Sequence, residues 1–417
     1  MKEENKKSIW KRISALAASA LLLFTAGSAN DSVKFPELKP PEVNAEFDAS
    51  HYNSILNNYP DLLNSRGTEI SLQEILSLQV GEETCDTMVP QGLAFKDGLI
   101  LVTAYDGING YKSDLLLHSY RKEYREKLDS EKEHEPHNSV IIVLDQESKK
   151  ILTTIELSDK NHVGGIAVDD ENVYIAKSGD EVISVISLEK IKEAAKNGKE
   201  KGIKQAKIDY DYHMYCGCDS SFVSLRETED GKNQLLVGTW IPFPSMSVIR
   251  VFDFGENNDL VLNQKFSINS SCNGATFVRR EDKEYLIVAC SMGRSFDSQL
   301  FVYEVETNDQ GKIDLKMKSQ SDLPPMVEEV AEYENQDGRR MIAINSEAFS
   351  TRYEIGRNKI ISNGIIVSDL DKLLDREGRP TRKGLGFKLD MYNPEKPKEE
   401  IDEEEKKKKD KDKDIER

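Results

Sequence analysis

A strand–turn–strand motif recurs five times along this chain of 417 residues, and this repeat constrains the fold more than any other feature. The clearest copies read "VPQGLAFKDGLILVTAYDG" from Val89, "HVGGIAVDDENVYIAKSGD" from His162 and "SCNGATFVRREDKEYLIVACSMGR" from Ser271; looser copies begin at Asp219 and Met326. A third strand follows each copy, and a more polar fourth strand such as "KQAKIDYDY" follows most of them. Four strands that recur every ~50–70 residues are typical of the blades of a β-propeller. We therefore predict an all-β fold, a β-propeller of five four-stranded blades with small helical additions, and six blades as the alternative.

The last copy of the repeat has no obvious fourth strand of its own. The segment "TEISLQ" (Thr68–Gln73) near the N-terminus has the composition to supply it and so to close the ring. Closure would protect the edges of many short strands from pairing with other chains. A short helix is expected over "EKIKEAAKNGKEKG", ended by Gly198 or Gly202. The domain therefore comprises a helical lead-in with the closing strand (48–86) and the propeller (87–392), which carries a charged, helical insertion (111–137).

The N-terminus has the pattern of a secretory signal peptide. Basic residues precede the apolar run "ISALAASALLLFTAG", which is too short to span a bilayer comfortably, and Gly27 and Ala29 are the small residues that a signal peptidase requires. We predict cleavage after Ala29 and a protein that is secreted, extracellular or associated with the cell wall. An uncleaved signal that anchors the chain in the membrane is the alternative. The segments 30–47 and 393–417 are predicted to be an extended linker and a disordered charged tail, since they offer too little apolar surface to fold.

The balance of charge limits the partners of this protein. The 75 acidic and 57 basic residues give a formal net charge of −18, which argues against nucleic-acid binding. The five cysteines are an odd number, so at least one is unpaired, and "CGC" lacks the second pair that a zinc site of that kind needs. We expect structural or partly disulfide-linked cysteines, a monomer, and an extracellular protein, peptide or glycan as partner.

Several segments of the repeat resemble a group of secreted propeller proteins of Gram-positive bacteria, within the wider quinoprotein-like and lactonase-like propellers. The segments that carry the resemblance are "VPQG" and "AYDG", "HNSVIIVLD", "HVGGIAV", "SMGRSFDSQLFVYE", and "LPPMVEEV" with "INSEAFSTRY". They span about Val89 to Leu370. The resemblance implies a propeller fold and secretion; it implies no particular reaction and no quinone cofactor.

One face of the predicted ring gathers the polar residues of the repeat. The start of the first strand of a blade lies beside the end of its antiparallel second strand, so all such junctions surround one central funnel. The insertion 111–137 leaves from the same face. The candidate binding residues there are Gln91, Tyr105, Asp106, Asp219, Trp240, Asn273 and Arg294.

The candidate catalytic residues are Glu328, Glu347 and His162. Glu328 and Glu329 are adjacent, so only one of them can face the channel, and Glu347 could pair with it as acid and base. A salt bridge to Arg294 is the structural alternative for this pair. His162 occupies a repeated position, where it either faces the funnel or bonds to a neighbouring blade.

Oxygen ligands at this face could also hold Ca²⁺, for which the candidates are Gln91, Asp219, Asn273 and Glu328, although the chain has no contiguous calcium motif. Two functions from different classes follow. The preferred one is a binding or scaffold module at the funnel face, because no complete catalytic motif is present. The alternative is a hydrolase of lactonase or glycosidase type that uses Glu328 and Glu347.

Overall fold

The computed structural model describes residues 70–71, 78–80, 83–85, 87–107, 136–293, 297–308, 312–350 and 364–378. The chain divides into two compact units, residues 1–46 and 47–417, and all described residues belong to the second. The predicted signal peptide, linker, lead-in helix and charged tail lie outside the described residues, as do Arg294 and almost all of the insertion. Within the described part of the chain, no helix has the length and apolarity needed to cross a membrane.

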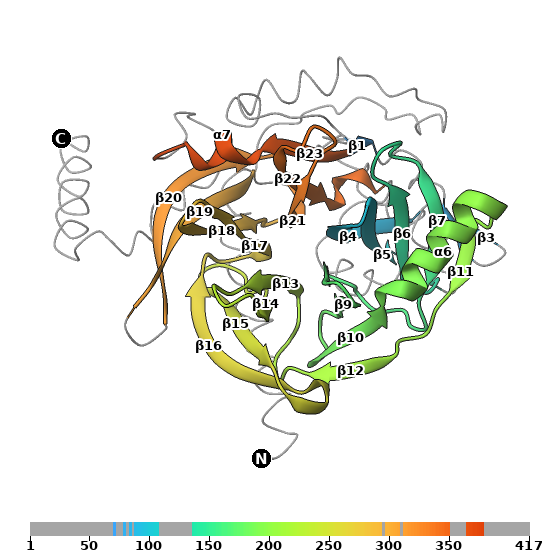
Figure 1. Cartoon of the computed structure of the whole chain (residues 1–417), viewed down its shortest axis with the longest axis horizontal. Helices are drawn as coiled ribbons and strands as arrows, with labels where there is room; N and C mark the ends of the chain where they lie inside the picture. The colour runs from blue at the N-terminus through green and yellow to red at the C-terminus, as the bar shows by residue number, and fades with distance from the viewer. Residues whose placement is uncertain are drawn as a thin grey trace, which may run out of the picture. The chain divides into compact units, whose positions relative to one another are not determined.

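Five sheets, antiparallel except for one added strand in blade one, are arranged in a ring around a central axis, as a five-bladed β-propeller (Figure 1). Blade one comprises β4 (Met88–Lys96), β5 (Leu99–Asp106), β6 (Val140–Asp145) and β7 (Ile151–Glu156). Blade two comprises β8 (Gly165–Val168), β9 (Asn172–Ala176), β10 (Val182–Ser187) and β12 (Tyr212–Tyr215). Blade three comprises β13 (Phe222–Glu227), β14 (Asn233–Thr239), β15 (Ser247–Phe254) and β16 (Leu260–Ile268). Blade four comprises β17 (Cys272–Arg280), β18 (Lys283–Cys290), β19 (Ser298–Thr307) and β20 (Ile313–Leu323). Blade five comprises β21 (Val327–Glu334), β22 (Arg340–Ser346), β23 (Gly364–Asp369) and β1 (Ile70–Ser71).

The ring is closed by the predicted N-terminal strand. β1 pairs with the outer edge of β23, with Ile70 opposite Ile365 and Ser71 opposite Gly364. The first and last parts of the propeller therefore share blade five, and the prediction that "TEISLQ" supplies its fourth strand is confirmed. The prediction of five four-stranded blades is confirmed as well.

The glycines of the repeat are explained by the contacts between blades. The innermost strands β4, β8, β13, β17 and β21 contact one another in turn around the axis. A Cβ atom added at Gly92 would lie 2.6 Å from the backbone nitrogen of Ile166, and one added at Gly165 would lie 2.6 Å from that of Val223. Real Cβ atoms do not come so close to a neighbour, so only glycine lets these inner strands approach each other as they do.

The predicted position of the fourth strand of blade two was wrong. The segment "KQAKIDYDY" is divided: β11 (Gln205–Lys207) pairs in parallel with β7 and extends blade one, whereas β12 is the outer strand of blade two. Helix α6 (Leu188–Lys201) carries the chain back to this edge, where a Cβ on Gly198 would lie 2.3 Å from the carbonyl oxygen of Leu152. The predicted helix is confirmed, and it ends at Gly202 in the left-handed conformation.

The remaining elements are small. A hairpin of β2 (Leu78–Val80) and β3 (Glu83–Cys85) precedes blade one and was not predicted. Helix α7 (Leu370–Leu374) follows β23, and two 3₁₀ turns, η3 (Glu256–Asn258) and η4 (Glu347–Phe349), complete the described elements.

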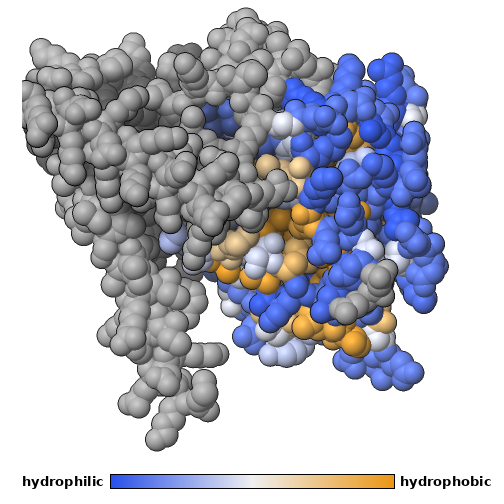
Figure 2. All heavy atoms as spheres, turned by 90° about the vertical axis from the view of Figure 1, so that its left-hand side faces the viewer, coloured by the Kyte–Doolittle hydropathy of each residue, from blue (hydrophilic) through white to orange (hydrophobic). Residues whose placement is uncertain are grey.

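Apolar side chains fill the spaces between adjacent blades. One cluster joins blades five and one through Leu93, Val102 and Ala343, and another joins blades three and four through Leu236, Ala275 and Val288. The view from the left-hand side of Figure 1 shows apolar residues among a mainly hydrophilic outer surface (Figure 2). Burial of these side chains between the sheets therefore stabilises the ring.

Candidate functional site

Gln91 is the centre of a polar network on the inner strands of the ring. It lies near the start of β4 and is fully buried, so both ends of its amide need partners. Its Nε2 donates to Glu347 Oε1 at 2.8 Å, and its Oε1 lies 2.5 Å from His162 Nε2. Because the amide oxygen accepts, His162 Nε2 is the donor in this arrangement. Asn345 also holds Gln91 in place, because its Nδ2 donates to the backbone oxygen of Gln91 at 2.8 Å.

His162 makes structural contacts through both its backbone and its side chain. Its backbone oxygen accepts the N–H groups of Gly164 (3.0 Å) and Ser178 (2.8 Å), which fixes the entry to β8. Its side chain is exposed, and its ring packs on Tyr105 with 4.3 Å between the ring centroids. The structure thus brings together His162, Tyr105, Gln91 and Glu347, which the sequence analysis named as separate candidates.

Glu328 begins the equivalent strand of blade five and pairs with an amide from blade four. Asn273 Nδ2 donates to Glu328 Oε1 at 2.9 Å and to the backbone oxygen of Val327 at 3.0 Å. Burial raises the pKa of Glu328 well above its usual range, the negative charges of Glu347 and Glu329 raise it further, and the hydrogen bond from Asn273 opposes the shift. Glu328 therefore keeps its proton to a higher pH than an ordinary glutamate, beside a second carboxylate.

Glu329 has different neighbours from Glu328, and both lie in the stretch of β21 between Val327 and Val330 where its register with β22 shifts. It is only 2% exposed and lies against blade four, where a Cβ on Gly274 would be 2.3 Å from its Oε1. Val330 N donates to that oxygen at 3.0 Å, and within the described residues Oε2 has no hydrogen-bond partner. Burial raises the pKa of Glu329 well above its usual range.

The other candidates lie elsewhere. Asp219 Oδ1 accepts the N–H of Gly179 at 2.8 Å, which fixes a turn of blade two. Gln91 Oε1 is bonded by His162, and the Ca²⁺ site proposed from Gln91, Asp219, Asn273 and Glu328 stays a prediction. Trp240 is 40% exposed at the end of β14, and its backbone N–H donates to Ser221 Oγ at 2.9 Å.

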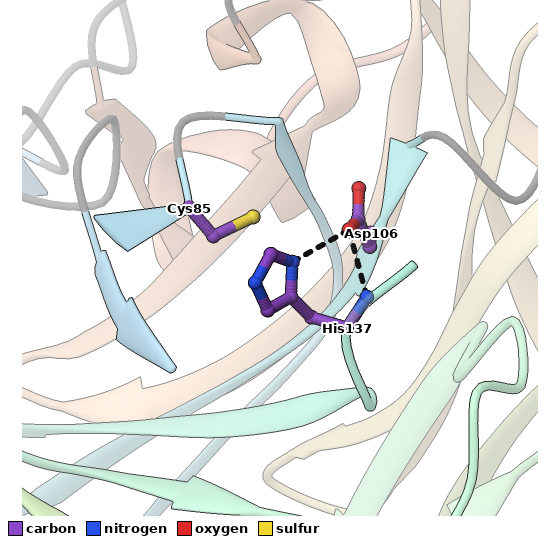
Figure 3. A group of neighbouring side chains, drawn as sticks. All are labelled: Cys85, Asp106 and His137. Carbon is purple, nitrogen blue, oxygen red and sulfur yellow. Dashed lines mark hydrogen bonds and ion pairs between the residues drawn. The ribbon is translucent and has the colours of Figure 1, made fainter. Parts of the chain in front are cut away.

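Asp106 belongs to a second polar cluster, at the end of β5. It follows Tyr105 and so faces the opposite side of the strand, where it is fully buried. Its Oδ2 accepts the backbone N–H of His137 and lies 2.9 Å from His137 Nδ1, and its Oδ1 accepts from Thr87 Oγ1 at 2.7 Å (Figure 3). Cys85 Sγ completes this cluster at 3.3 Å from Thr87 Oγ1. The sequence analysis missed Cys85 and His137, because neither lies in the repeat.

Comparison with known proteins adds little to this geometry. No family model matches the chain, and no curated protein matches it. Among solved structures, it is similar to hydrazine synthase of Kuenenia stuttgartiensis (13% identity, TM-score 0.34, covering 62% of this chain and 61% of that one). It is also similar to an endo-arabinase of Bacteroides thetaiotaomicron (9%, TM-score 0.39, 70% and 96%) and to a GH32 β-fructofuranosidase of Bombyx mori (9%, TM-score 0.36, 76% and 64%). The chain spans less than two thirds of the length of the first and third of these, and likenesses of this size carry no argument about activity.

Proposed function

We propose that this protein is a hydrolase of glycosidase type that works with two funnel carboxyl groups, Glu328 as general acid and Glu347 as general base. The observation that carries the proposal is the pair of carboxyl groups that amide side chains hold in place, Glu328 by Asn273 and Glu347 by Gln91. Burial, and then the charge of Glu347, raise the pKa of Glu328. A carboxyl group with a raised pKa near a second carboxyl group is an arrangement that glycoside hydrolysis uses.

Each group has a defined part in the proposed reaction. Glu328 gives its proton to the glycosidic oxygen as the bond to the anomeric carbon breaks. Glu347 takes a proton from the water molecule that attacks this carbon. In each turnover Glu328 therefore loses one proton and Glu347 gains one. Asn273 and Gln91 act as positioning residues, since each donates one amide N–H to one of the two carboxyl groups.

Exposed aromatic groups would supply the sugar-binding surface. Trp240 is exposed at the end of the second strand of blade three, the same end of a blade to which Tyr105 belongs in blade one. The face of an indole ring can stack on the apolar face of a sugar. We further propose that the protein acts outside the cell as a monomer, after cleavage behind Ala29; N-terminal sequencing of the exported protein should then begin at Asn30.

The test is hydrolysis of aryl glycosides and of soluble glycans, followed through the release of phenol or of reducing ends. Replacement of Glu328 or Glu347 by Gln should lower kcat/KM by about 10²–10⁴-fold, because each removes one proton-transfer group. The matched control is Glu334→Gln, at the exposed end of the same strand as Glu328, which should keep full activity. If the wild-type protein hydrolyses none of these substrates, or if Glu328→Gln retains its rate, the hydrolase proposal is wrong.

A binding module for an extracellular glycan or peptide is the second candidate, and the exposed indole of Trp240 favours it. In that case Trp240→Ala would weaken binding in a glycan or peptide array by about 10-fold or more, which corresponds to the loss of one aromatic contact. Glu328→Gln would leave binding unchanged, and no product would form.

A further inference from the structure

We propose that Cys85, Asp106 and His137 bind a zinc ion at a site separate from the funnel carboxyl groups. These three residues come from three segments: the end of β3, the end of β5 and the chain just before β6. One ligand atom from each of them can be chosen so that all lie within 4.8 Å of one another. Figure 3 shows the sulfur of Cys85 directed towards the imidazole and carboxyl groups.

The types of ligand identify the metal. A thiolate, an imidazole and a carboxylate together suit Zn²⁺, whereas Ca²⁺ and Mg²⁺ require oxygen ligands only. Asp106 Oδ2 and His137 Nδ1 are already 2.9 Å apart. Two ligands that each lie about 2.0–2.1 Å from a tetrahedral zinc ion are about 3.3 Å apart, so a shift of a few tenths of an ångström would let both coordinate it.

Burial makes this position suitable for a bound metal ion. The side chain of Asp106 is fully buried and lies against the imidazole of His137, and Cys85 is buried beside them. A cation bound among these groups would be little screened by water, so its attraction to a carboxylate and a thiolate would be strong. The side chain of His137 is 16% exposed, so solvent reaches part of the cluster and water could serve as a fourth ligand. Three protein ligands and one open position are typical of catalytic zinc sites.

An outer partner also holds the carboxylate in place. Thr87 Oγ1 donates to Asp106 Oδ1 at 2.7 Å, so that Oδ2 faces His137. Hydrogen bonds of this kind orient metal ligands and tune their affinity. Asp106 and His137 flank residues 108–135, so a bound ion would also tie both ends of this segment to β3.

The test uses the full chain, stripped with a chelator, reduced, and titrated with Zn²⁺ and with Co²⁺. The wild type should bind one equivalent of each, and the Co²⁺ complex should show a thiolate-to-cobalt charge-transfer absorption. Replacement Cys85→Ser should abolish this absorption, and Cys85→Ser or His137→Gln should weaken Zn²⁺ binding by at least about 100-fold. Thr87→Val, which removes the hydroxyl contacts with Asp106 and Cys85 but no ligand atom, should weaken it by about 10-fold.

Matched controls are Cys290→Ser, a buried cysteine of blade four, and His213→Gln on β12; both should leave binding and spectrum unchanged. If the wild type binds no stoichiometric Zn²⁺, or if its Co²⁺ complex lacks the thiolate absorption, the proposal is overturned without recourse to any variant. Retention of that absorption in folded Cys85→Ser, checked by circular dichroism, would assign the metal to another cysteine and would overturn it equally.

Discussion

At the scale of single residues, the two adjacent glutamates Glu328 and Glu329 have different surroundings, although both have raised pKa values. Glu328 has an amide donor and a second carboxylate beside it. Glu329 lies in the packing between blades four and five, and one of its oxygens has no partner within the described residues. The first environment suits proton transfer, whereas the second imposes a cost on the folded state whenever the group ionises.

We therefore expect Glu329→Gln to stabilise the protein at neutral pH. A raised pKa means that the folded state binds the proton more tightly than the unfolded state does. Stability then falls as the pH rises from the ordinary glutamate pKa of about 4.3 towards the raised folded value. The variant cannot ionise here, so its free energy of unfolding should change less between pH 5 and pH 8 than that of the wild type.

Urea denaturation at the two pH values measures this difference. Glu334→Gln, at the exposed end of the same strand, serves as the control and should follow the wild type. An equal pH dependence in Glu329→Gln and wild type would show that Glu329 does not titrate in this range.

The repeat made part of the site predictable. Gln91, His162, Asn273 and Glu328 all lie near the start of a blade's first strand, so the repeat alone places them around one axis. Their hydrogen-bond partners were not predictable, because these depend on the rotation of each side chain. The hydrogen bonds of Asp106 with Thr87 and His137 were not predictable either, because both partners lie outside the repeat.

At the scale of elements, glycines at a few positions allow the inner strands of adjacent blades to pack closely against each other. Gly165 is the clearest example, since its Cα lies against the backbone of Phe222 and Val223 in the next blade. Backbone atoms of a central strand cannot move aside as the tip of a side chain can.

Gly165→Ala should accordingly lower the free energy of unfolding by at least about 2 kcal/mol, measured by urea denaturation. The control is Gly255→Ala in a turn of blade three, where the nearest atom to the added Cβ is a methyl group of Val261 at 3.1 Å. That methyl group can rotate away, so the control should cost much less. Equal costs would mean that the inner strands can separate freely.

The sequence predicted most strands but not the outer edges of blades one and two. Polar outer strands have weak alternation, so "KQAKIDYDY" did not show where it would pair. The first part of this segment, β11, pairs with the free edge of β7. This pairing is possible only because α6 brings the chain back to blade one.

At the scale of the whole molecule, five sheets form one closed ring, with clusters of apolar side chains packed between them. The only contribution of β1 that the structure describes is its pairing with β23, yet this pairing joins the two ends of the ring. Loss of β1 would leave β23 as an exposed edge.

We predict that a chain starting at residue 76 is less stable than one starting at residue 66, which retains β1, by about 1–2 kcal/mol. It should also aggregate sooner on heating, because the edge of β23 is then available to other molecules. Thermal melts and light scattering of the two chains compare these properties. Identical melting and scattering curves would contradict a role for β1 in closing the ring.

Pairing between β1 and β23 also has a consequence for the order of folding. During synthesis β1 emerges before any blade, whereas β23 emerges after almost all of the propeller. The four other blades can form sheets from neighbouring segments as they appear, but blade five must wait for a contact between the two extremes of the propeller. Until that contact forms, the nascent protein exposes two unpaired edges at once, so the interval between the last blade and closure is the period when it most needs protection from other chains.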